Sequence, residues 1–322
     1  MSAPPLDLVA GHRALRGAGA AVRLERDTLV VSGPEATSFL QGQLSQDVAG
    51  LAVRSSAWSL LLQPSGKVDA WLRVSRLADD RFLLDVDSGW GEAVVARLER
   101  FKLRTKASVE VAPDWHVVAV RAAEGTDVEA LAAGVVTAMA PGDPADEVVV
   151  ASAACPGLAG VDVLAPLPFA VELGLPEAGT DAYEVARIEC GVPSMGAELT
   201  DATIPAEAGA WLVSTSVSFT KGCYTGQELV ARIDSRRAQV PRPLRGVVVD
   251  EPVDLPPVGA ELQVDEVVVG RLTSVCQPPD RAGPVGLAPV ARSVEASTPC
   301  RLVWSGGNVA ASVTTVPLPA PA

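Results

Sequence analysis

The chain has 322 residues, of which 48% are hydrophobic and 20% are charged. The chain is longer than the length at which a single hydrophobic core stops growing, so two or three packed subdomains are expected. The 26 basic and 39 acidic residues give a net charge of −13, which argues against direct binding of nucleic acid or anionic lipid. No apolar run reaches the about 18 residues of a membrane span, and the first residues lack the apolar core of a secretion signal. We therefore expect a cytoplasmic protein.

The rare residue types argue against several common catalytic centres. The five cysteines are scattered along the chain and never form a CxxC pair, so neither a disulfide framework nor a self-contained zinc site is indicated. The two histidines, His12 and His116, give poor support to a histidine-based metal centre or to a Ser-His-Asp triad. We predict no metal site.

The first third of the chain predicts mixed α and β structure. Residues 28–48 resemble a strand, a Gly-Pro turn and a helix. Residues 55–77 predict two antiparallel strands, with Gln63–Gly66 as the turn of their hairpin. The stretch "WGEAVVARLERFKLR", residues 90–104, has helical periodicity. Its predicted apolar face consists of Ala93, Val94, Leu98 and Phe101.

The last 80 residues have a different pattern. From residue 244 on, short valine-rich runs alternate with glycine and proline, and Gly306-Gly307 is typical of a tight hairpin turn. We therefore predict an α+β region over residues 1–240, built of two interleaved lobes, and a small β-barrel or β-sandwich over residues 241–322.

The stretch "SFTKGCYTGQELVARI", residues 218–233, combines a lysine, a cysteine and a helix-like run. Thr225 and Glu228 match the S/T-x-x-E capping box, which predicts that a helix begins at Thr225. Cys223 then lies just ahead of a helix N-terminus and two residues after Lys221. Both the peptide dipole and the lysine ammonium would favour its thiolate form.

The glycines of this stretch support a functional role for the cysteine. Gly222 and Gly226 leave room on both sides of the thiol for a ligand or for unusual backbone angles. The alternative is that Cys223 is a small buried hydrophobic residue, which is the usual role of a free cysteine. Residues 221–245 also carry six basic and two acidic side chains, a local excess that suits a small polyanionic ligand.

The segment "KGCYTGQE" resembles the signature of the YgfZ family of folate-binding proteins, which are relatives of the glycine-cleavage T-protein (aminomethyltransferase) and of mitochondrial iron-sulfur assembly factors. The similarity extends over nearly the whole chain, in the same order. The other similar blocks are "GPEATSFLQGQLSQDV", "QPSGKV", "LERFKLRTKA", "YEVARIECGVPSMGAELTDATIPAEA", and "GRLTSV" with "GLAPVAR".

The resemblance implies a T-protein-like ring of α+β lobes with a six-stranded type of C-terminal β-barrel and a central tetrahydrofolate pocket. Arg187 and Glu189 match the place where T-proteins hold the pterin with a carboxylate, which can accept two hydrogen bonds from a 2-amino-4-oxo pterin edge. The resemblance also implies that the signature segment is functional and that Cys223 is its key residue. Its members are Lys221 and Cys223, as catalytic residues, and Tyr224, Gly226, Gln227 and Glu228, as folate-binding residues.

Three functions follow from this resemblance. The first is a folate-dependent accessory factor for the assembly or repair of iron-sulfur clusters, with iron-sulfur proteins as partners. The second is a true aminomethyltransferase, but Asp87 and the Gln46-Asp47 pair depart from the residues that T-proteins usually have. If the carboxylate of Asp47, Asp69 or Asp87 faced the folate, the aminomethyltransferase function would be favoured. The third is a tRNA-modification factor acting through iron-sulfur enzymes. The negative net charge argues against direct binding of RNA by this chain.

Overall fold

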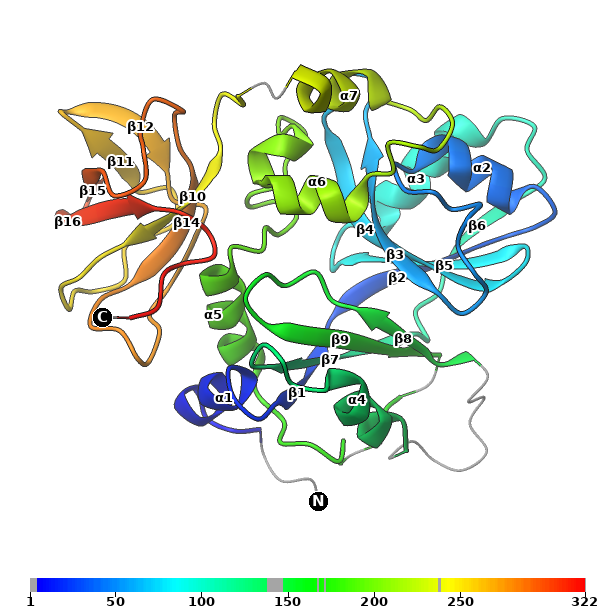
Figure 1. The fold of residues 1–322 in the computed structure, drawn as a ribbon, viewed down its shortest axis with the longest axis horizontal. Coiled ribbons are helices and arrows are strands. Elements are labelled where there is room, and N and C mark those ends of the chain that lie inside the picture. The colour runs from blue at the N-terminus through cyan, green and yellow to red at the C-terminus, as the bar shows by residue number, and fades with distance from the viewer. Residues whose placement is uncertain (1–4, 138–146, 167, 171, 237–238, 322) are drawn as a thin grey trace.

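The structure is a computed structural model that describes residues 5–137, 147–166, 168–170, 172–236 and 239–321. Its strands form three sheets, which lie at the upper right, at the bottom and at the left of Figure 1. Within these residues, no helix combines the length and the apolar character that crossing a membrane requires. The observed class is α+β, as predicted.

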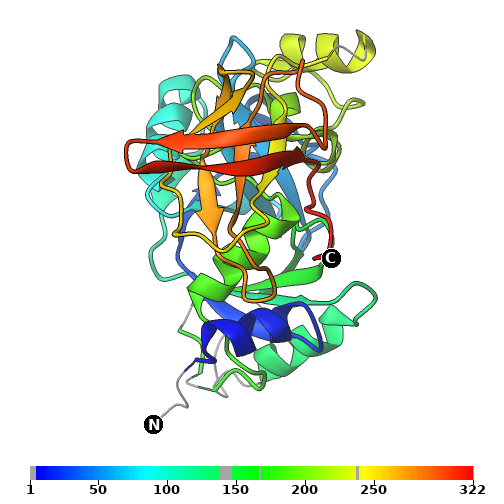
Figure 2. The ribbon, with the colours of Figure 1, turned by 90° about the vertical axis from the view of Figure 1, so that its left-hand side faces the viewer.

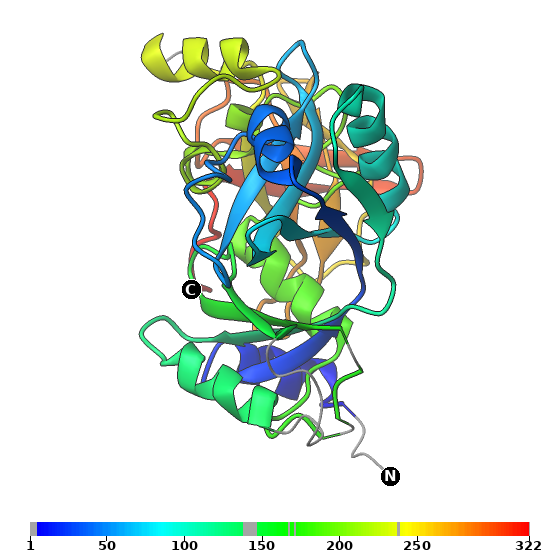
Figure 3. The same ribbon diagram turned by 90° about the vertical axis from the view of Figure 1, so that its right-hand side faces the viewer.

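The first sheet contains the predicted strands and hairpin. Its five antiparallel strands run in the order β3-β4-β5-β2-β6, and helices α2 and α3 pack on it (Figure 3). Gln63 N–H donates to Lys67 O, which closes the hairpin at the predicted turn. Ala93 is exposed, so the buried face of α3 is narrower than predicted. The bounds are β2 (Arg26–Ser32), α2 (Ala36–Gln43), β3 (Ser56–Leu62), β4 (Val68–Ala78), β5 (Arg81–Asp87), α3 (Gly91–Lys102) and β6 (Ser108–Val111).

The second sheet is interleaved with the first along the chain. Its four antiparallel strands run in the order β1-β7-β9-β8. Helix α4 covers one face with an apolar cluster, while α1 and α5 pack through alanine and leucine side chains on the other. The bounds are α1 (Leu8–Leu15), β1 (Ala20–Leu24), β7 (His116–Ala122), α4 (Val128–Thr137), β8 (Val149–Ser152), β9 (Ala159–Ala165) and α5 (Thr180–Cys190).

The C-terminal strands form one curled sheet of seven strands, in the order β12-β11-β15-β16-β10-β14-β13. A bridge from Gly270 to Val290 brings β12 to the end of β14, so the sheet bends into part of a barrel. Figure 2 shows this sheet in front of α5. The bounds are β10 (Leu244–Val248), β11 (Glu261–Val264), β12 (Val267–Arg271), β13 (Ser274–Cys276), β14 (Val285–Pro289), β15 (Pro299–Trp304) and β16 (Gly307–Thr314).

Three short helices link α5 to the C-terminal sheet: the 3-10 helix η2 (Pro205–Ala208), α6 (Ala210–Ser216) and α7 (Gln227–Arg236). After β16 the chain returns to α5. Leu318 N–H donates to the carbonyl of Glu189 at 2.7 Å, and a side chain added at Gly191 would overlap Val316. The terminal segment 316–318 therefore closes the packing around the end of α5.

Buried ion pairs join the first two sheets. Arg73 on β4 is fully buried and donates to Asp85 at 2.9 Å and to Asp162 on β9 at 2.7 Å. Asp162 also accepts from Arg121 at 2.8 Å. Although burial raises the pKa of Asp162, the charges of Arg121 and Arg73 lower it to about 2. Because each charge has a partner from another strand, the ion pairs fix how the two sheets meet.

We predict that Arg73→Met lowers the free energy of unfolding by about 3 kcal/mol, because it leaves two buried carboxylates with one partner each. The control is Arg271→Met, which removes a surface pair with Glu261 and should cost below about 1 kcal/mol. Urea unfolding of both variants measures the difference. Equal stabilities would contradict the role given to the buried pairs.

Candidate functional site

Helix α5 turns its two predicted pterin-binding residues in different directions. Arg187 faces inward, where its guanidinium donates to Glu184 at 2.6 and 2.7 Å and to the carbonyl of Val192 at 2.6 Å. Burial lowers the pKa of Arg187, but the Glu184 and Glu198 carboxylates hold it above its usual value. Arg187 thus lines the space between α5 and the two N-terminal sheets.

Glu189 lies on another side of α5, against α1. Its carboxylate contacts His12 Nε2 at 2.8 Å, Arg16 Nη1 at 3.1 Å and Arg281 Nε at 3.6 Å. Burial raises the pKa of Glu189, but the hydrogen bond from His12 and the charge of Arg16 hold it below its usual value. Residues two apart on an α-helix point about 200° apart, so the prediction that Arg187 and Glu189 hold one ligand together does not fit this geometry.

A central cavity of about 190 Å³ lies where α5 meets both N-terminal sheets. Its wall carries acidic, basic and aromatic groups. Asp87 accepts from Arg26 at 2.8 Å with one oxygen and from the N–H of Met195 at 2.9 Å with the other. Trp58 and Trp71 stack with ring centroids 4.4 Å apart. The polar and aromatic lining residues are Glu25, Arg26, Trp58, Trp71, Asp87, Ser88, Arg121, Asp162, Tyr183, Glu184, Arg187 and Ser194.

A wider chamber of about 630 Å³ lies next to the cavity, on the side of β1 and β7. The two spaces share Leu24, Glu25, Tyr183 and Glu184 as lining residues. Burial raises the pKa of Tyr183, so its hydroxyl stays protonated near neutral pH. The cavity and the chamber thus lie on either side of the same four residues.

The signature segment lies elsewhere, on the C-terminal end of α2. The Lys221 ammonium donates to the carbonyls of Gln41, Leu44 and Gln46 at 2.6, 2.6 and 2.9 Å. Burial lowers the pKa of Lys221 to about 8. The ammonium thus satisfies carbonyls at a helix end, where a cation is favoured, and it anchors the segment to the first sheet's helix.

The helix after the signature begins later than predicted. Helix α7 starts at Gln227 and not at Thr225, because Gly226 has a positive φ of 81° and breaks the helical path. The Gln227 side chain accepts from the N–H of Tyr224 at 3.2 Å. Glu228 pairs with Arg232 at 2.8 Å, as the i, i+4 spacing allows. The predicted capping box between Thr225 and Glu228 is therefore replaced by a glycine turn.

The glycines flanking Cys223 have different surroundings. A side chain at Gly226 would overlap the carbonyl oxygen of Gln63, so this glycine permits close packing on the β3–β4 hairpin. Gly222 faces open space. Cys223 itself is exposed. The segment is thus fixed at Lys221 and Gly226 and presents the thiol between them to solvent. It is not among the residues that line the central cavity.

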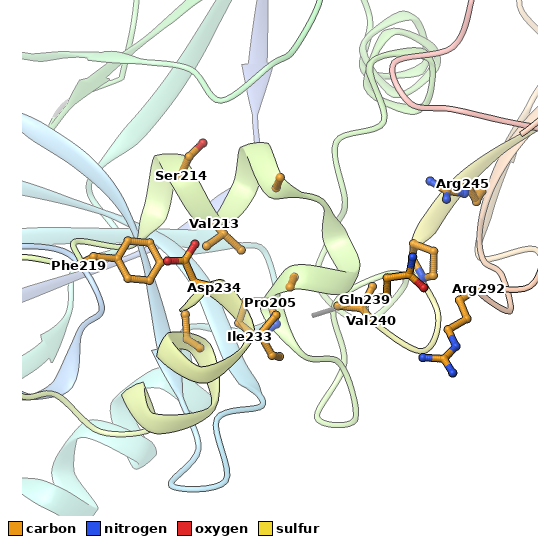
Figure 4. Close-up of a pocket in the computed structure, with 14 residues that line it drawn as sticks. Pro205, Val213, Ser214, Phe219, Ile233, Asp234, Gln239, Val240, Arg245 and Arg292 are labelled. Atoms are coloured by element: carbon orange, nitrogen blue, oxygen red, sulfur yellow. The ribbon is translucent and has the colours of Figure 1, made fainter. Parts of the chain in front are cut away.

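A groove of about 620 Å³ lies beside the signature segment, between α6, α7 and the start of β10 (Figure 4). Its floor is apolar, with Phe219 and Asp234 at one end and Arg245 and Arg292 at the other. Residues 237 and 238, in the stretch predicted to be locally basic, lie outside the described residues. Two basic side chains of that stretch lie apart from each other. Arg245 lines the groove, whereas Lys221 contacts the carbonyls at the end of α2.

One cluster has the composition of a metal site. His12, Glu189 and Asp280 bring ligand atoms within 4.8 Å of one another. Arg16 and Arg281, however, lie against the same carboxylate, and two guanidinium groups oppose the binding of a further cation. We interpret the cluster as an ion-pair network that holds α1 to α5.

Sequence reasoning missed most of the central cavity. It did not select Trp58, Trp71, Arg121, Asp162 or Tyr183. The available signal was a charge inside an apolar strand, as in "DAWLRVSRL" and "GVDVLA", since an unpaired charge is rarely buried. Trp58 on β3 and Trp71 on β4 gave no comparable signal, because tryptophan is common in any sheet.

No family model matches the chain. It is 27% identical to an uncharacterized protein of Haemophilus influenzae over 65% of this chain and 66% of that protein. It is 28% identical to the mitochondrial iron-sulfur cluster assembly factor IBA57 homolog of Pyricularia oryzae over 68% and 54%. It is 29% identical to an aminomethyltransferase of Bordetella petrii over 57% and 55%. The matches thus span about half to two thirds of these relatives' own length.

The fold is that of a solved T-protein. The crystal structure of glycine cleavage system aminomethyltransferase T from Bartonella henselae superposes with a TM-score of 0.77 at 22% identity, over 97% of this chain and 90% of that one. The expected T-protein-like architecture is confirmed, with the curled seven-stranded sheet in the place of the C-terminal barrel. The relatives of this chain include both iron-sulfur assembly factors and aminomethyltransferases.

We predict that Lys221→Met loosens the signature segment, because it leaves three carbonyls of the α2 end without their cation. Leaving a buried polar group unsatisfied costs about 1 to 3 kcal/mol. Amide hydrogen exchange should rise in residues 217–226, while Lys102→Met, which removes an i, i+3 surface pair with Glu99, should leave it unchanged. Unaltered exchange in both variants would show that Lys221 does not anchor the segment.

Proposed function

We propose that this chain binds tetrahydrofolate in the central cavity and serves the assembly or repair of iron-sulfur clusters through Cys223, as a member of the YgfZ family. The observation that carries the proposal is the cavity itself. It places carboxylates, guanidinium groups and aromatic rings together where the lobes of a T-protein fold meet.

The lining residues fit a pterin ring. A 2-amino-4-oxo pterin edge donates hydrogen bonds, and Glu184 offers carboxylate oxygens that can each accept more than one. The rings of Trp58, Trp71 and Tyr183 supply flat apolar surface. Drug-sized ligands usually occupy about 300 to 1,000 Å³, so a cavity of about 190 Å³ suits the ring, while the adjoining chamber suits the aminobenzoyl-glutamate tail.

In this proposal the cavity residues bind and orient the ligand, and the reactive group belongs to the ligand itself. Arg187 donates to both oxygens of Glu184, which holds the carboxylate in one position at the cavity wall, and each oxygen can accept a further hydrogen bond from the ligand. Tetrahydrofolate supplies a reduced ring that can carry a one-carbon unit. This assignment moves the pterin carboxylate from Glu189 to Glu184, five residues earlier on the same helix.

Cys223 is proposed to act at the outer surface. Lys221, Tyr224, Gly226 and Gln227 hold the segment in place through the contacts described above, so we assign them to positioning and not to folate binding. An exposed thiol on a fixed loop is accessible to a second protein. The iron-sulfur assembly factors among the relatives support partners of that kind. Direct contact with nucleic acid is not part of the proposal.

An aminomethyltransferase is the second candidate, because aminomethyltransferases are among the relatives and Asp87 lines the cavity. Asp87 is held by Arg26 and by the N–H of Met195, much as Glu184 is held by Arg187, so its place in the cavity wall counts in favour of this candidate. Asp69 is paired with Arg97 and Asp47 accepts from Gln41, and neither lines the cavity. The accessory factor stays the first candidate because iron-sulfur assembly factors are among the relatives and because the exposed thiol of Cys223 lies outside the cavity.

We predict that Glu184→Gln weakens tetrahydrofolate binding by about 1.5 to 3 kcal/mol, the range for a hydrogen bond to a charged group. This corresponds to a roughly 10- to 150-fold higher Kd. The matched control is Glu189→Gln, which should leave the affinity of the folded protein unchanged. Isothermal titration calorimetry measures both. The reverse result, with Glu189 sensitive and Glu184 not, would return the pterin to the site first expected.

We predict that Cys223→Ser keeps the fold and the folate affinity but fails to restore iron-sulfur enzyme activity in cells lacking the native gene. The reason is that Cys223 is exposed and contributes nothing to the core. Cys276→Ser is the control, because Cys276 is a buried thiol of another cluster. Full restoration by Cys223→Ser would reject the role of the thiol and leave folate binding to stand on its own test.

A further inference from the structure

The groove between α6, α7 and the start of β10 has an apolar floor that the function proposed above does not use. Val213 of α6 and Val230 and Ile233 of α7 line it. Val230 belongs to the first sheet's apolar cluster and Val213 packs against that cluster, so the floor rests on a packed core. Phe219, at one end, is 49% exposed. The volume of about 620 Å³ lies within the roughly 300 to 1,000 Å³ of ligand pockets.

Two arginines lie at the other end of the groove, on neighbouring stretches of backbone. The N–H of Val290 donates to the carbonyl of Pro243 at 3.1 Å, and the N–H of Arg292 donates to the carbonyl of Pro241 at 3.0 Å. These bonds continue the antiparallel pairing of β10 with β14, so the backbone that carries Arg245 and Arg292 is fixed. The Nε of Arg245 is buried and has no hydrogen-bond partner among the described residues. Because buried donors are normally hydrogen-bonded, this end of the groove is suited to an acceptor.

The end at Phe219 carries a negative charge. Asp234 of α7 is exposed and lies beside Phe219 there (Figure 4). Within the part of the chain that the structure describes, none of Asp234, Arg245 and Arg292 forms an ion pair with another side chain. The groove thus presents unpaired charges of opposite sign at its two ends, with apolar surface between them.

This distribution of charge indicates what the groove can bind. An acyl chain with a carboxylate would match the arginines, but it would leave Asp234 without a partner at its apolar end. A nucleic acid would be repelled by Asp234 and would gain nothing from the apolar floor. A protein segment can carry a basic side chain, a few apolar ones and an acidic one in succession, so it complements the floor and both ends together.

We propose that this groove is a docking site for a segment of another protein in which apolar residues separate a basic residue from an acidic one. The acidic side chain accepts charge-assisted hydrogen bonds from Arg245 and Arg292, and the basic one pairs with Asp234. Phe219 lies four positions before Cys223, so a bound segment lies beside the part of the chain that presents the exposed thiol. The proposal does not depend on the folate site or on the role of that thiol.

The test titrates the full chain with synthetic peptides by isothermal titration calorimetry. Each peptide has blocked ends and carries one lysine and one glutamate, separated by two, three or four residues of leucine and valine. We expect at least one of the three to bind, and exchange of its glutamate for glutamine to weaken it about 10-fold. Arg245→Gln should weaken it by a similar factor. The control is Arg301→Gln, which removes an exposed arginine of β15 outside the groove and should leave binding unchanged.

An exchange of charge separates a binding role from a structural one. A peptide with lysine at both ends should bind Arg292→Glu more tightly than the original chain, because the altered end no longer repels its second lysine. Arg292 is exposed, so this variant tests the proposal even if Arg245→Gln fails to fold. If none of the peptides binds at millimolar concentration, or if Arg292→Glu does not alter their order of affinity, the proposal is wrong. Binding of decanoate without binding of the peptides would assign the groove to an acyl carboxylate and likewise overturn it.

Discussion

The row of buried ion pairs between β4, β5 and β9 is the interaction on which the N-terminal region depends. Arg26, Arg73 and Arg121 alternate with Asp85 and Asp162, and Asp87 closes the row at the Arg26 end. Three guanidinium groups thereby meet three carboxylates. Removing one member leaves its neighbours charged and buried, which costs far more than an exposed pair. The two sheets are therefore held in one relative position, and the central cavity is the space that this position leaves beside α5.

Much of the fold could be predicted from local patterns. The strand, turn and helix of residues 28–48 and the hairpin at Gln63–Gly66 follow from hydrophobic periodicity and turn residues, which act over a few positions. The valine-rich runs after residue 244 likewise indicated strands. The way β1 joins β7 in a second sheet depends on pairing across about 100 residues, and no short pattern carries that information. The boundary between residues 240 and 241 stays a prediction.

The candidate site could be predicted less well, for geometric reasons. The role of the signature segment stays a prediction, and the partners of Lys221 are backbone carbonyls at and just after the end of α2, which no residue pattern identifies. Arg187 and Glu189 were selected together because both match the place where T-proteins hold the pterin, but helical geometry points residues two apart in different directions. The helix start at Gln227 was missed because Gly226 packs against the β3–β4 hairpin, a contact made far along the chain.

The return of residues 316–318 to α5 bears on the order in which the chain acquires its structure. The cluster around Val185 and Ile188 of α5 takes its other members from β10, β13 and β14 and from Leu318. During synthesis from the N-terminus, the first two sheets can pair and bury their charges while this side of α5 is still uncovered. It is enclosed only when the last strands and residues 316–318 have emerged from the ribosome. Until then the nascent protein exposes an apolar helix face, which makes this stage the one at which a chaperone has a surface to bind.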